Sequence, residues 1–311
     1  MIENCKIVMY HYVRPIKNSK YPEIKGLELD SFIRQINHLK KKFHILTATE
    51  FLDGLINQEK IKKNSILLTF DDGLKDHYSH VYSILKKNQL QGLFFISSEP
   101  TLKRKILDVH KIHFILEKNE NRNNLVNEIF QAIKKNKEEY DLSSPEEYFS
   151  KLSKPNRFDS GDTIFIKRIL QRNLPHKLRE KIVNDLFIKY VTEDLNSFRE
   201  ELYLSKDEIN EMAENGMYFG SHGHSHEWYT QMNEIQLKNE LETSFNFCSK
   251  INYNENRLIF CYPYGNYNEQ VVENVSKMGF VAGLTTDVGD AELVSNCAYT
   301  IKRYDTNDFP Q

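Results

Sequence analysis

Short apolar runs alternate with amphipathic stretches in two flanks of the chain, residues 1–97 and 201–311. The runs CKIVMY, ILLTF, GLFFIS, MYFGS, LIFCY and FVAGLT have the length and composition of buried strands. A helix is predicted to begin near Asp30, because apolar residues then recur at helical spacing along Phe32, Ile36, Leu39 and Phe43. Strands and helices in strict alternation predict an α/β fold, with βα units forming a parallel sheet or barrel.

Helix boundary signals support the same alternation. Ser205 and Glu208 have the spacing of a capping box, and Gly216 stands where the helix that follows them should end. The other helical patterns span about 77–88, 233–250 and 268–278. Each lies between two predicted strands, as a βα series requires.

The middle of the chain, residues 101–200, has a different pattern. It contains one of the twelve glycines, Gly161, and its segments KIHFILEKN, NLVNEIFQAIKKN and REKIVNDLFIKYV have helical period. Its net charge is about +4, which leaves about −6 on the flanks of a chain whose total is −2. We interpret it as a mostly helical insertion with a solvated basic face. It interrupts a single barrel domain made of residues 1–100 and 201–311.

Composition and charge exclude several function classes. With 311 residues, 40% hydrophobic and 28% charged, the chain is typical of globular proteins, and no apolar run is long enough to span a bilayer. A net charge of −2 gives no sign of a nucleic-acid partner. The start, MIENCKIVMYHYVR, lacks the pattern of a secretory signal, and the cysteines are scattered without a CxxC pair. We therefore expect a cytoplasmic protein in a reducing compartment.

The first candidate for chemistry is the segment Thr69–Gly73, which reads TFDDG and ends the apolar run ILL. Neighbouring side chains on an extended segment point to opposite sides, so Asp71 and Asp72 need not share one role. One carboxylate can bind a cation while the other takes a proton. Taken alone, the segment is more typical of an ordinary polar βα turn.

The second candidate is the segment GSHGHSH, in which His222, His224 and His226 fall within five residues. Neutral imidazole is a common ligand for zinc and similar metals. His222 and His226 can reach one point if the backbone turns there. The alternative is a surface cluster or a helix-capping segment, but the density of histidines favours a metal.

Two further groups are weak signals alone. Tyr262, Pro263 and Tyr264 belong to a rigid CYPYG turn whose backbone N–H groups can form an oxyanion hole and whose rings can contact a sugar. His11 follows the run CKIVMY. Most such turns are only turns, and a lone histidine is more often structural.

The position of these four groups strengthens all of them. Each lies just past the C-terminal end of a predicted strand, and in a parallel barrel those ends meet on one face, where active sites are built. Asp72, His222 and His226 with an open fourth position match the ligand set of catalytic zinc. The sequence therefore predicts a mononuclear metal site on this face.

In these motifs the sequence resembles the polysaccharide deacetylase family, the NodB-homology group of carbohydrate esterases. Thr69–Gly73 match its TFDDG motif, and His222 and His226 match its spaced histidine pair, with Gly223 in place of a hydroxyl residue. Pro263–Gly265 match its Pro-Tyr-Gly turn. The resemblance covers both flanks and implies an irregular (β/α) barrel of the NodB type.

The resemblance also implies roles for these residues. Asp71 would be the general base, and Asp72, His222 and His226 would hold a divalent metal, most often Zn²⁺. The backbone N–H of Tyr264 would stabilise the oxyanion. The reaction would be hydrolysis of an N-acetyl, less often O-acetyl, group on an amino sugar or glycan of a surface-glycan or glycan-precursor pathway.

The sequence departs from the family at two points. Cys261 occupies the position of an arginine that orients the catalytic aspartate, and Arg303 can take its place from another strand end. We also count Arg303, with Tyr262 and Pro263, among the candidate substrate-binding residues. No histidine follows His226, so the late histidine that serves the family as general acid has no match. His11 is the first candidate for that acid, and His224 is the second.

Two alternatives remain open at this point. A non-catalytic glycan-binding or assembly protein on the same barrel would explain the missing arginine and histidine. An unrelated metallohydrolase would use HGHSH alone, as metallo-β-lactamase-like enzymes use a similar cluster, but TFDDG has no place in it. The intact set Asp71, Asp72, His222 and His226 favours the deacetylase.

Overall fold

A computed structural model describes residues 4–156, 159–252 and 255–311. The chain divides into two compact units. The first, called the sheet unit, consists of Met1–Asn18, Lys25–Lys105 and Arg199–Gln311. The second, called the helical unit, consists of Ser19–Ile24 and Ile106–Phe198.

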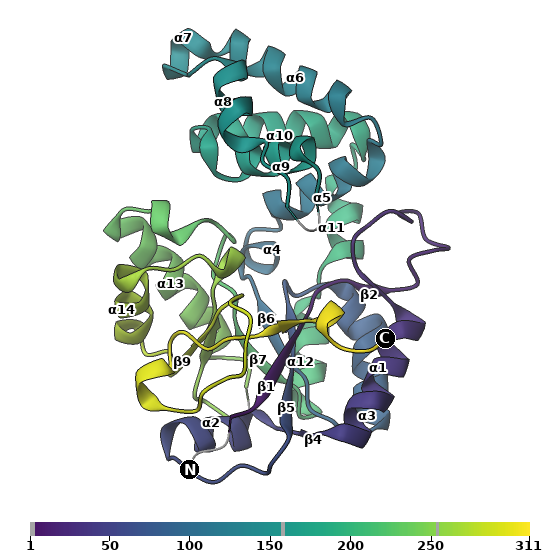
Figure 1. Ribbon diagram of the computed structural model, residues 1–311, viewed down its shortest axis with the longest axis vertical. Helices are drawn as coiled ribbons and strands as arrows, with labels where there is room; N and C mark the ends of the chain where they lie inside the picture. The colour runs from purple at the N-terminus through teal and green to yellow at the C-terminus, as the bar shows by residue number, and fades with distance from the viewer. Residues whose placement is uncertain (1–3, 157–158, 253–254) are drawn as a thin grey trace. The chain divides into compact units, whose positions relative to one another are not determined.

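The sheet unit is built on a curled parallel sheet with the strand order β10-β1-β5-β6-β7-β8-β9, and β4 also pairs with β5 (Figure 1). The strands are β1 (Lys6–Tyr10), β4 (His44–Ile45), β5 (Ser65–Asp71), β6 (Leu93–Ile96), β7 (Tyr218–Ser221), β8 (Ile259–Cys261), β9 (Ala282–Leu284) and β10 (Tyr304–Asp305). Two short strands, β2 (Val13–Arg14) and β3 (Leu27–Glu28), pair separately. The predicted α/β fold with a parallel, irregular barrel-like sheet is confirmed.

Helices connect these strands, as the periodicity predicts. They are α1 (Leu29–Lys42), α2 (Ala48–Ile56), the π-helix η1 (His77–Tyr82) with α3 (Ser83–Lys87), α4 (Glu99–Leu102), α12 (Lys206–Glu214), α13 (Glu234–Cys248) and α14 (Glu269–Met278). Ser205 and Glu208 form the predicted capping box, in which each side chain accepts from the other's backbone N–H. Gly216 has a φ of +87° after the end of α12, a conformation that glycine adopts at little cost. Short 3₁₀ turns complete the unit: η3 (Tyr229–Gln231), η4 (Pro263–Gly265), η5 (Ser295–Cys297) and η6 (Thr306–Asp308).

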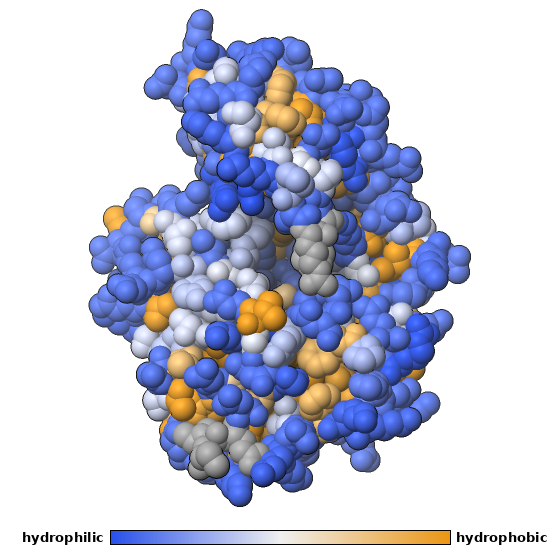
Figure 2. All heavy atoms as spheres, viewed as in Figure 1, coloured by the Kyte–Doolittle hydropathy of each residue, from blue (hydrophilic) through white to orange (hydrophobic). Residues whose placement is uncertain are grey.

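The helical unit contains the predicted helices of the middle region. They are α5 (Asp108–Lys118), α6 (Arg122–Lys135), α7 (Lys137–Tyr140), α8 (Pro145–Leu152), α9 (Gly161–Arg168), the π-helix η2 (Ile169–Asn173) and α10 (His176–Tyr190), and α11 (Leu195–Leu202) follows. Aromatic rings hold it together: Phe165 packs against Phe130 and Phe149, with ring centroids 5.8 and 5.0 Å away. None of the helices in the described residues has the length and apolar character needed to cross a membrane. Figure 2 shows hydrophilic side chains over most of the visible face.

The two faces of the sheet carry alternate residues of each strand, and this alternation positions the site. In β5, Ile66, Leu68 and Phe70 belong to the core cluster that also contains residues of α1, α12, α13 and α14. Leu67 belongs to the other cluster, with residues of α2. Since side chains alternate along a strand, Thr69 and Asp71 share the face of Leu67.

Candidate functional site

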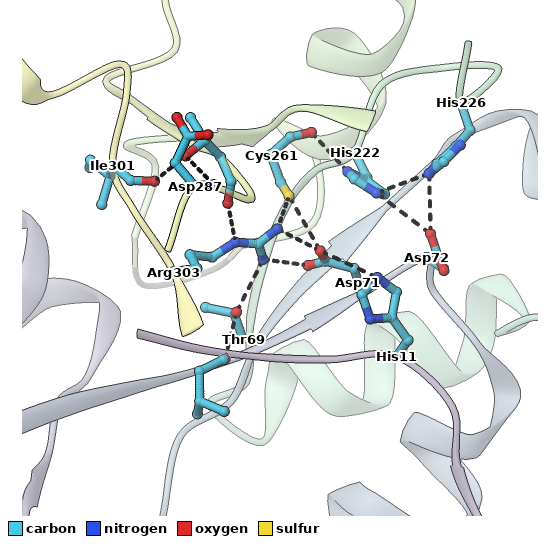
Figure 3. Close-up of polar contacts among 12 residues, drawn as sticks. His11, Thr69, Asp71, Asp72, His222, His226, Cys261, Asp287, Ile301 and Arg303 are labelled. Carbon is cyan, nitrogen blue, oxygen red and sulfur yellow. Dashed lines mark hydrogen bonds and ion pairs between the residues drawn. The ribbon is translucent and has the colours of Figure 1, made fainter. Parts of the chain in front are cut away.

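The same alternation brings four polar side chains to one end of the sheet (Figure 3). Asp71 ends β5 four residues after Leu67, and Cys261 ends β8 two residues after Ile259, so each side chain lies on the same face of the sheet as that apolar residue. His222 follows β7 and His11 follows β1. Each comes four residues after an apolar residue of the same cluster, Tyr218 and Ile7 respectively, so alternation places it on the same face of the sheet. The predicted convergence at the C-terminal strand ends is therefore observed.

Asp71 forms a buried, two-bonded ion pair with Arg303. The Nη1 and Nη2 atoms of Arg303 donate to Oδ1 and Oδ2 of Asp71 over 2.9 and 2.8 Å. The remaining guanidinium donors reach the Thr285 carbonyl at 2.8 Å, the Thr69 hydroxyl at 3.2 Å and the Cys261 sulfur at 3.0 Å. The Arg303 side chain is 0% exposed, so the guanidinium is fully occupied by protein partners.

This pair sets the ionisation of Asp71. Burial alone would raise the pKa of its carboxyl group, but the Arg303 charge, with His222 and the Arg303 hydrogen bonds, outweighs burial and lowers the pKa to about 2. The pKa of Arg303 is raised in return by the carboxylate, against the effect of its own burial. Asp71 is thus a fixed anion at neutral pH.

Cys261 stands beside this pair as a neutral neighbour. Burial raises the pKa of its thiol well above the ordinary value. Its sulfur lies 3.5 Å from Asp71 Oδ2, and its small side chain leaves room for the guanidinium that comes from the segment before β10. The arginine missing from the third motif is therefore replaced in space by Arg303.

The second carboxylate, Asp72, faces a different pair of partners. Its Oδ1 lies 3.5 Å from His222 Nε2 and 3.4 Å from His226 Nε2, and the two nitrogens are 3.2 Å apart. Ligands at about 2.0–2.1 Å from a tetrahedral metal are separated by about 3.4 Å, so the three atoms fit one ion. The donor set, two imidazoles and one carboxylate, is that of a catalytic zinc or similar divalent site.

The protonation of His222 also fits a cation ligand. Its Nδ1 lies 2.8 Å from the Cys261 carbonyl oxygen, which can only accept, so Nδ1 carries the proton and the Nε2 lone pair is left for a metal. Burial lowers the pKa of His222, despite the opposing charges of Asp71 and Asp72, and keeps the ring neutral. Asp71, His222 and Cys261 also lie near one another, but the Arg303 guanidinium is bonded to two of them and disfavours a cation there.

The Pro263–Gly265 turn borders the candidate metal ligands. Tyr264 has a φ of +58°, an unusual conformation for a residue with a side chain, and backbone strain of this kind concentrates at functional sites. Its ring contacts the His226 ring at a centroid distance of 4.6 Å and stacks on Trp228 at 4.7 Å. Sequence reasoning missed Trp228, although it is the only tryptophan and lies two residues after His226.

Two of the residues predicted to bind substrate are enclosed by the protein. Tyr262 is 0% exposed, its hydroxyl donates to the Tyr299 carbonyl, and it follows Phe260 onto the helix-covered face of the sheet. Arg303 is enclosed and bonds to Asp71, the orienting role also considered for it. Pro263, the third of these candidates, is buried in the turn.

The two candidate acids have different environments. His11 is 40% exposed at its side chain, and its Nε2 lies 4.0 Å from Asp71 Oδ2. His224 is buried, and its Nδ1 lies 2.8 Å from the Ser98 hydroxyl. His11 thus lies beside Asp71, whereas the His224 ring contacts Ser98.

The glycine in the histidine motif has a steric cause. Gly223 has a φ of +76°, and a Cβ atom there would collide with the hydroxyl of Tyr229. A hydroxyl is still present nearby, because Ser221 Oγ accepts from the Gly223 N–H at 3.1 Å. Gly223, which stands where the family has a hydroxyl residue, therefore fits the space beside Tyr229, and the hydroxyl of Ser221 bonds to its backbone.

Comparison with known proteins agrees with this geometry. The polysaccharide deacetylase family model matches residues 58–137 and 178–283, more than half of the chain. YxkH of Bacillus subtilis (strain 168), a protein assigned to the polysaccharide deacetylases, is 28% identical over 89 residues. That match spans 29% of this chain and 32% of YxkH, so only about a third of the relative's length is covered.

Solved structures agree in fold. The Streptococcus pyogenes deacetylase PplD, in complex with acetate, has a TM-score of 0.60 at 17% identity, covering 98% of this chain and 93% of PplD. IcaB from Ammonifex degensii has a TM-score of 0.56 at 16% identity, covering 98% and 92%. On the extent of the family match, which includes both carboxylates, both histidines and the Pro-Tyr-Gly turn, this chain belongs to the polysaccharide deacetylase family.

Proposed function

We propose that the protein is a metal-dependent hydrolase that removes an N-acetyl group, or less often an O-acetyl group, from a sugar of a glycan or glycan precursor. The observation that carries this proposal is the pairing of two sites on adjacent residues. An ionised Asp71 stands beside a three-atom donor set of Asp72, His222 and His226. Family membership supports the same reaction.

Each residue then has one task. Asp72, His222 and His226 would hold the divalent cation, most often Zn²⁺, and a bound cation supplies Lewis acidity toward the acyl oxygen and acidity toward water. Asp71 takes the proton from the attacking water, and Arg303 keeps the carboxylate ionised and oriented. The backbone N–H of Tyr264 would donate to the oxyanion. His11, partly exposed beside Asp71, would return a proton to the leaving amine, so that water and the acetylated sugar give acetate and a free amine.

The test is release of acetate from N-acetylated and O-acetylated amino-sugar oligomers, with added Zn²⁺ and after chelation. We expect release by the metal-loaded wild type and a loss of at least about 100-fold in Asp71→Asn, since a general base contributes about 10²–10⁴-fold. Asp71→Asn should still bind the cation, because Asp71 is not in the proposed ligand set. Full activity of Asp71→Asn would contradict the assignment of the base.

The same experiment addresses the rival functions. A wild type that binds cation and glycan but releases no acetate from any acetylated sugar would favour a glycan-binding protein. The cytoplasmic location expected from the sequence stays a proposal, which cell fractionation would test.

A further inference from the structure

The two histidine ligands are joined by a loop whose shape decides where their nitrogens point. Residues 222–226 follow β7, and the loop contains two positive φ angles, +76° at Gly223 and +55° at His226. A positive φ is unfavourable for a histidine, so contacts outside the loop must hold His226 in this conformation. Those contacts are made by two elements, α13 and the start of α4.

Glu240 of α13 supports the loop immediately before His226. Its Oε2 accepts hydrogen bonds from the backbone N–H groups of His224 and Ser225 at 3.2 and 2.9 Å. Its Oε1 accepts from the Ser225 hydroxyl at 2.7 Å, and the Tyr229 hydroxyl is 3.4 Å from Oε2. One half-buried carboxylate thus fixes both residues that lie between Gly223 and His226.

The start of α4 holds the other side of the loop. The backbone N–H of Ser98 donates to the Gly223 carbonyl at 3.1 Å, and that of Glu99 donates to the His224 carbonyl at 3.0 Å. The His224 ring lies 2.8 Å from the Ser98 hydroxyl. The middle histidine of the motif is therefore an anchor of the loop, while His222 and His226 belong to the donor set.

From these contacts we infer that Glu240 is a positioning residue for the cation site, which holds residues 224 and 225 so that His226 Nε2 meets His222 Nε2 and Asp72 Oδ1. The inference rests on the proposed function, since it concerns the same cation. Its basis is the hydrogen-bond geometry, because the carboxylate touches the backbone between the ligands. Outer residues that orient metal ligands typically contribute 10–100-fold to metal affinity.

Three variants separate positioning from a general structural role. Glu240→Ala removes every acceptor. Glu240→Gln keeps one carbonyl oxygen for the two N–H groups, and its amide can donate to the Ser225 hydroxyl, which is able to accept. Glu242→Ala is the matched control on the same helix, with an exposed side chain.

Zn²⁺ affinity would be measured without substrate, by calorimetry with a competing chelator, together with thermal unfolding of the metal-free proteins. We expect Glu240→Ala to bind Zn²⁺ about 10–100-fold more weakly, with Glu240→Gln within about threefold of wild type and Glu242→Ala unchanged. Metal-free Glu240→Ala should still unfold cooperatively, but at a lower temperature than Glu242→Ala because it loses three hydrogen bonds. Wild-type affinity in Glu240→Ala, or a loss in Glu240→Gln as large as in Glu240→Ala, would overturn the inference.

A fourth variant, Ser225→Ala, covers the case in which Glu240→Ala does not fold. Ser225→Ala removes only the 2.7 Å contact to Oε1, and it should weaken Zn²⁺ binding by a few-fold. Unchanged affinity there would then count against the inference. If the wild type itself binds no divalent cation, the proposed metal-dependent function fails. If the wild type binds Zn²⁺ and the variants bind equally, only the role of Glu240 fails.

Discussion

Asp71 and Asp72 are neighbours in the chain, but their surroundings are opposite in kind. Asp71 is bonded on both oxygens by a fully buried guanidinium, which keeps it ionised at neutral pH and disfavours a second cation beside it. Asp72 faces two imidazoles whose nitrogens lie within 3.5 Å of its Oδ1. The Arg303 guanidinium is the cation beside Asp71, whereas Asp72 and the two imidazoles form a donor set suited to a bound metal ion.

The difference arises at the end of one strand, where two adjacent carboxylates meet different partners. β5 ends at Asp71, which keeps the strand's alternation, whereas Asp72 has a φ of +78° and leaves it. Because the backbone changes direction between them, the two carboxylates are presented to different groups although they are adjacent. The predictions below test each side separately.

The largest effect is expected on the Asp72 side. His226→Ala removes one of three donor atoms, and loss of a ligand should cost more than the 10–100-fold that outer residues contribute to metal affinity. Zn²⁺ affinity should therefore fall by more than about 100-fold and acetate release should fall with it. Titration calorimetry and an acetate assay measure both. His224→Ala, with its ring bonded to Ser98, should retain more Zn²⁺ affinity than His226→Ala, and the reverse order would show that the ligand was misassigned.

The next largest effect is expected from Arg303→Met, on the Asp71 side. Removing one partner of a buried ion pair costs about 3–5 kcal/mol in the free energy of unfolding. Burial then meets less opposition, so the pKa of Asp71 should rise from about 2 and the acidic limb of the kcat/KM profile should move to higher pH. Arg303→Lys, which keeps the charge, should shift it less. An acidic limb at the same pH in all three proteins would argue against Arg303 as the partner of the base.

The same ion pair gives the wild type a pH-dependent stability. The folded pKa of Asp71, about 2, lies below its ordinary value of 3.8. Its contribution is therefore present above about pH 4 and is lost as the pH falls toward 2. Denaturant titrations between pH 5 and 2 should show a steeper loss of unfolding free energy in the wild type than in Arg303→Met. If the unfolding free energy falls equally with pH in both proteins, the ion pair does not contribute the expected pH-dependent stability.

A smaller effect is expected from Cys261→Ser. The hydroxyl can still accept from Arg303, so we expect a loss of about 1–2 kcal/mol in the free energy of unfolding and less than tenfold in kcat. Zn²⁺ affinity should not change, since Cys261 contacts the Asp71 side. A strong loss of Zn²⁺ in this variant would indicate that the thiol is a ligand and would remove the distinction between the two sides.

The smallest effect is expected from Tyr262→Phe. It deletes one hydrogen bond to the Tyr299 carbonyl, which is worth about 1 kcal/mol of unfolding free energy. The KM for an acetylated sugar should stay the same, because the residue lies in the core. A raised KM with unchanged stability would return Tyr262 to the substrate-binding residues.

Much of this arrangement could be predicted from local sequence. Apolar runs located the strands, and the residues after them located the site, because parallel strands end on one edge. The burial of Tyr262 was not foreseen because the CYPYG turn was treated as a unit, whereas the alternation of β8 continues and places Cys261 and Tyr262 on opposite faces. Trp228 was missed because its stacking on Tyr264 joins two separate turns, and spacing along the chain gives no sign of such a contact.

The Asp71–Arg303 pair joins residues 232 positions apart, and β10, which follows Arg303 directly, pairs with β1 near the other end of the sequence. The proposed base therefore depends on a contact between distant parts of the chain, whereas the proposed cation ligands come from strands β5 and β7 and the turns after them. A substitution that weakens the β10–β1 pairing would therefore act on the partner of Asp71 and leave Asp72, His222 and His226 in their own elements.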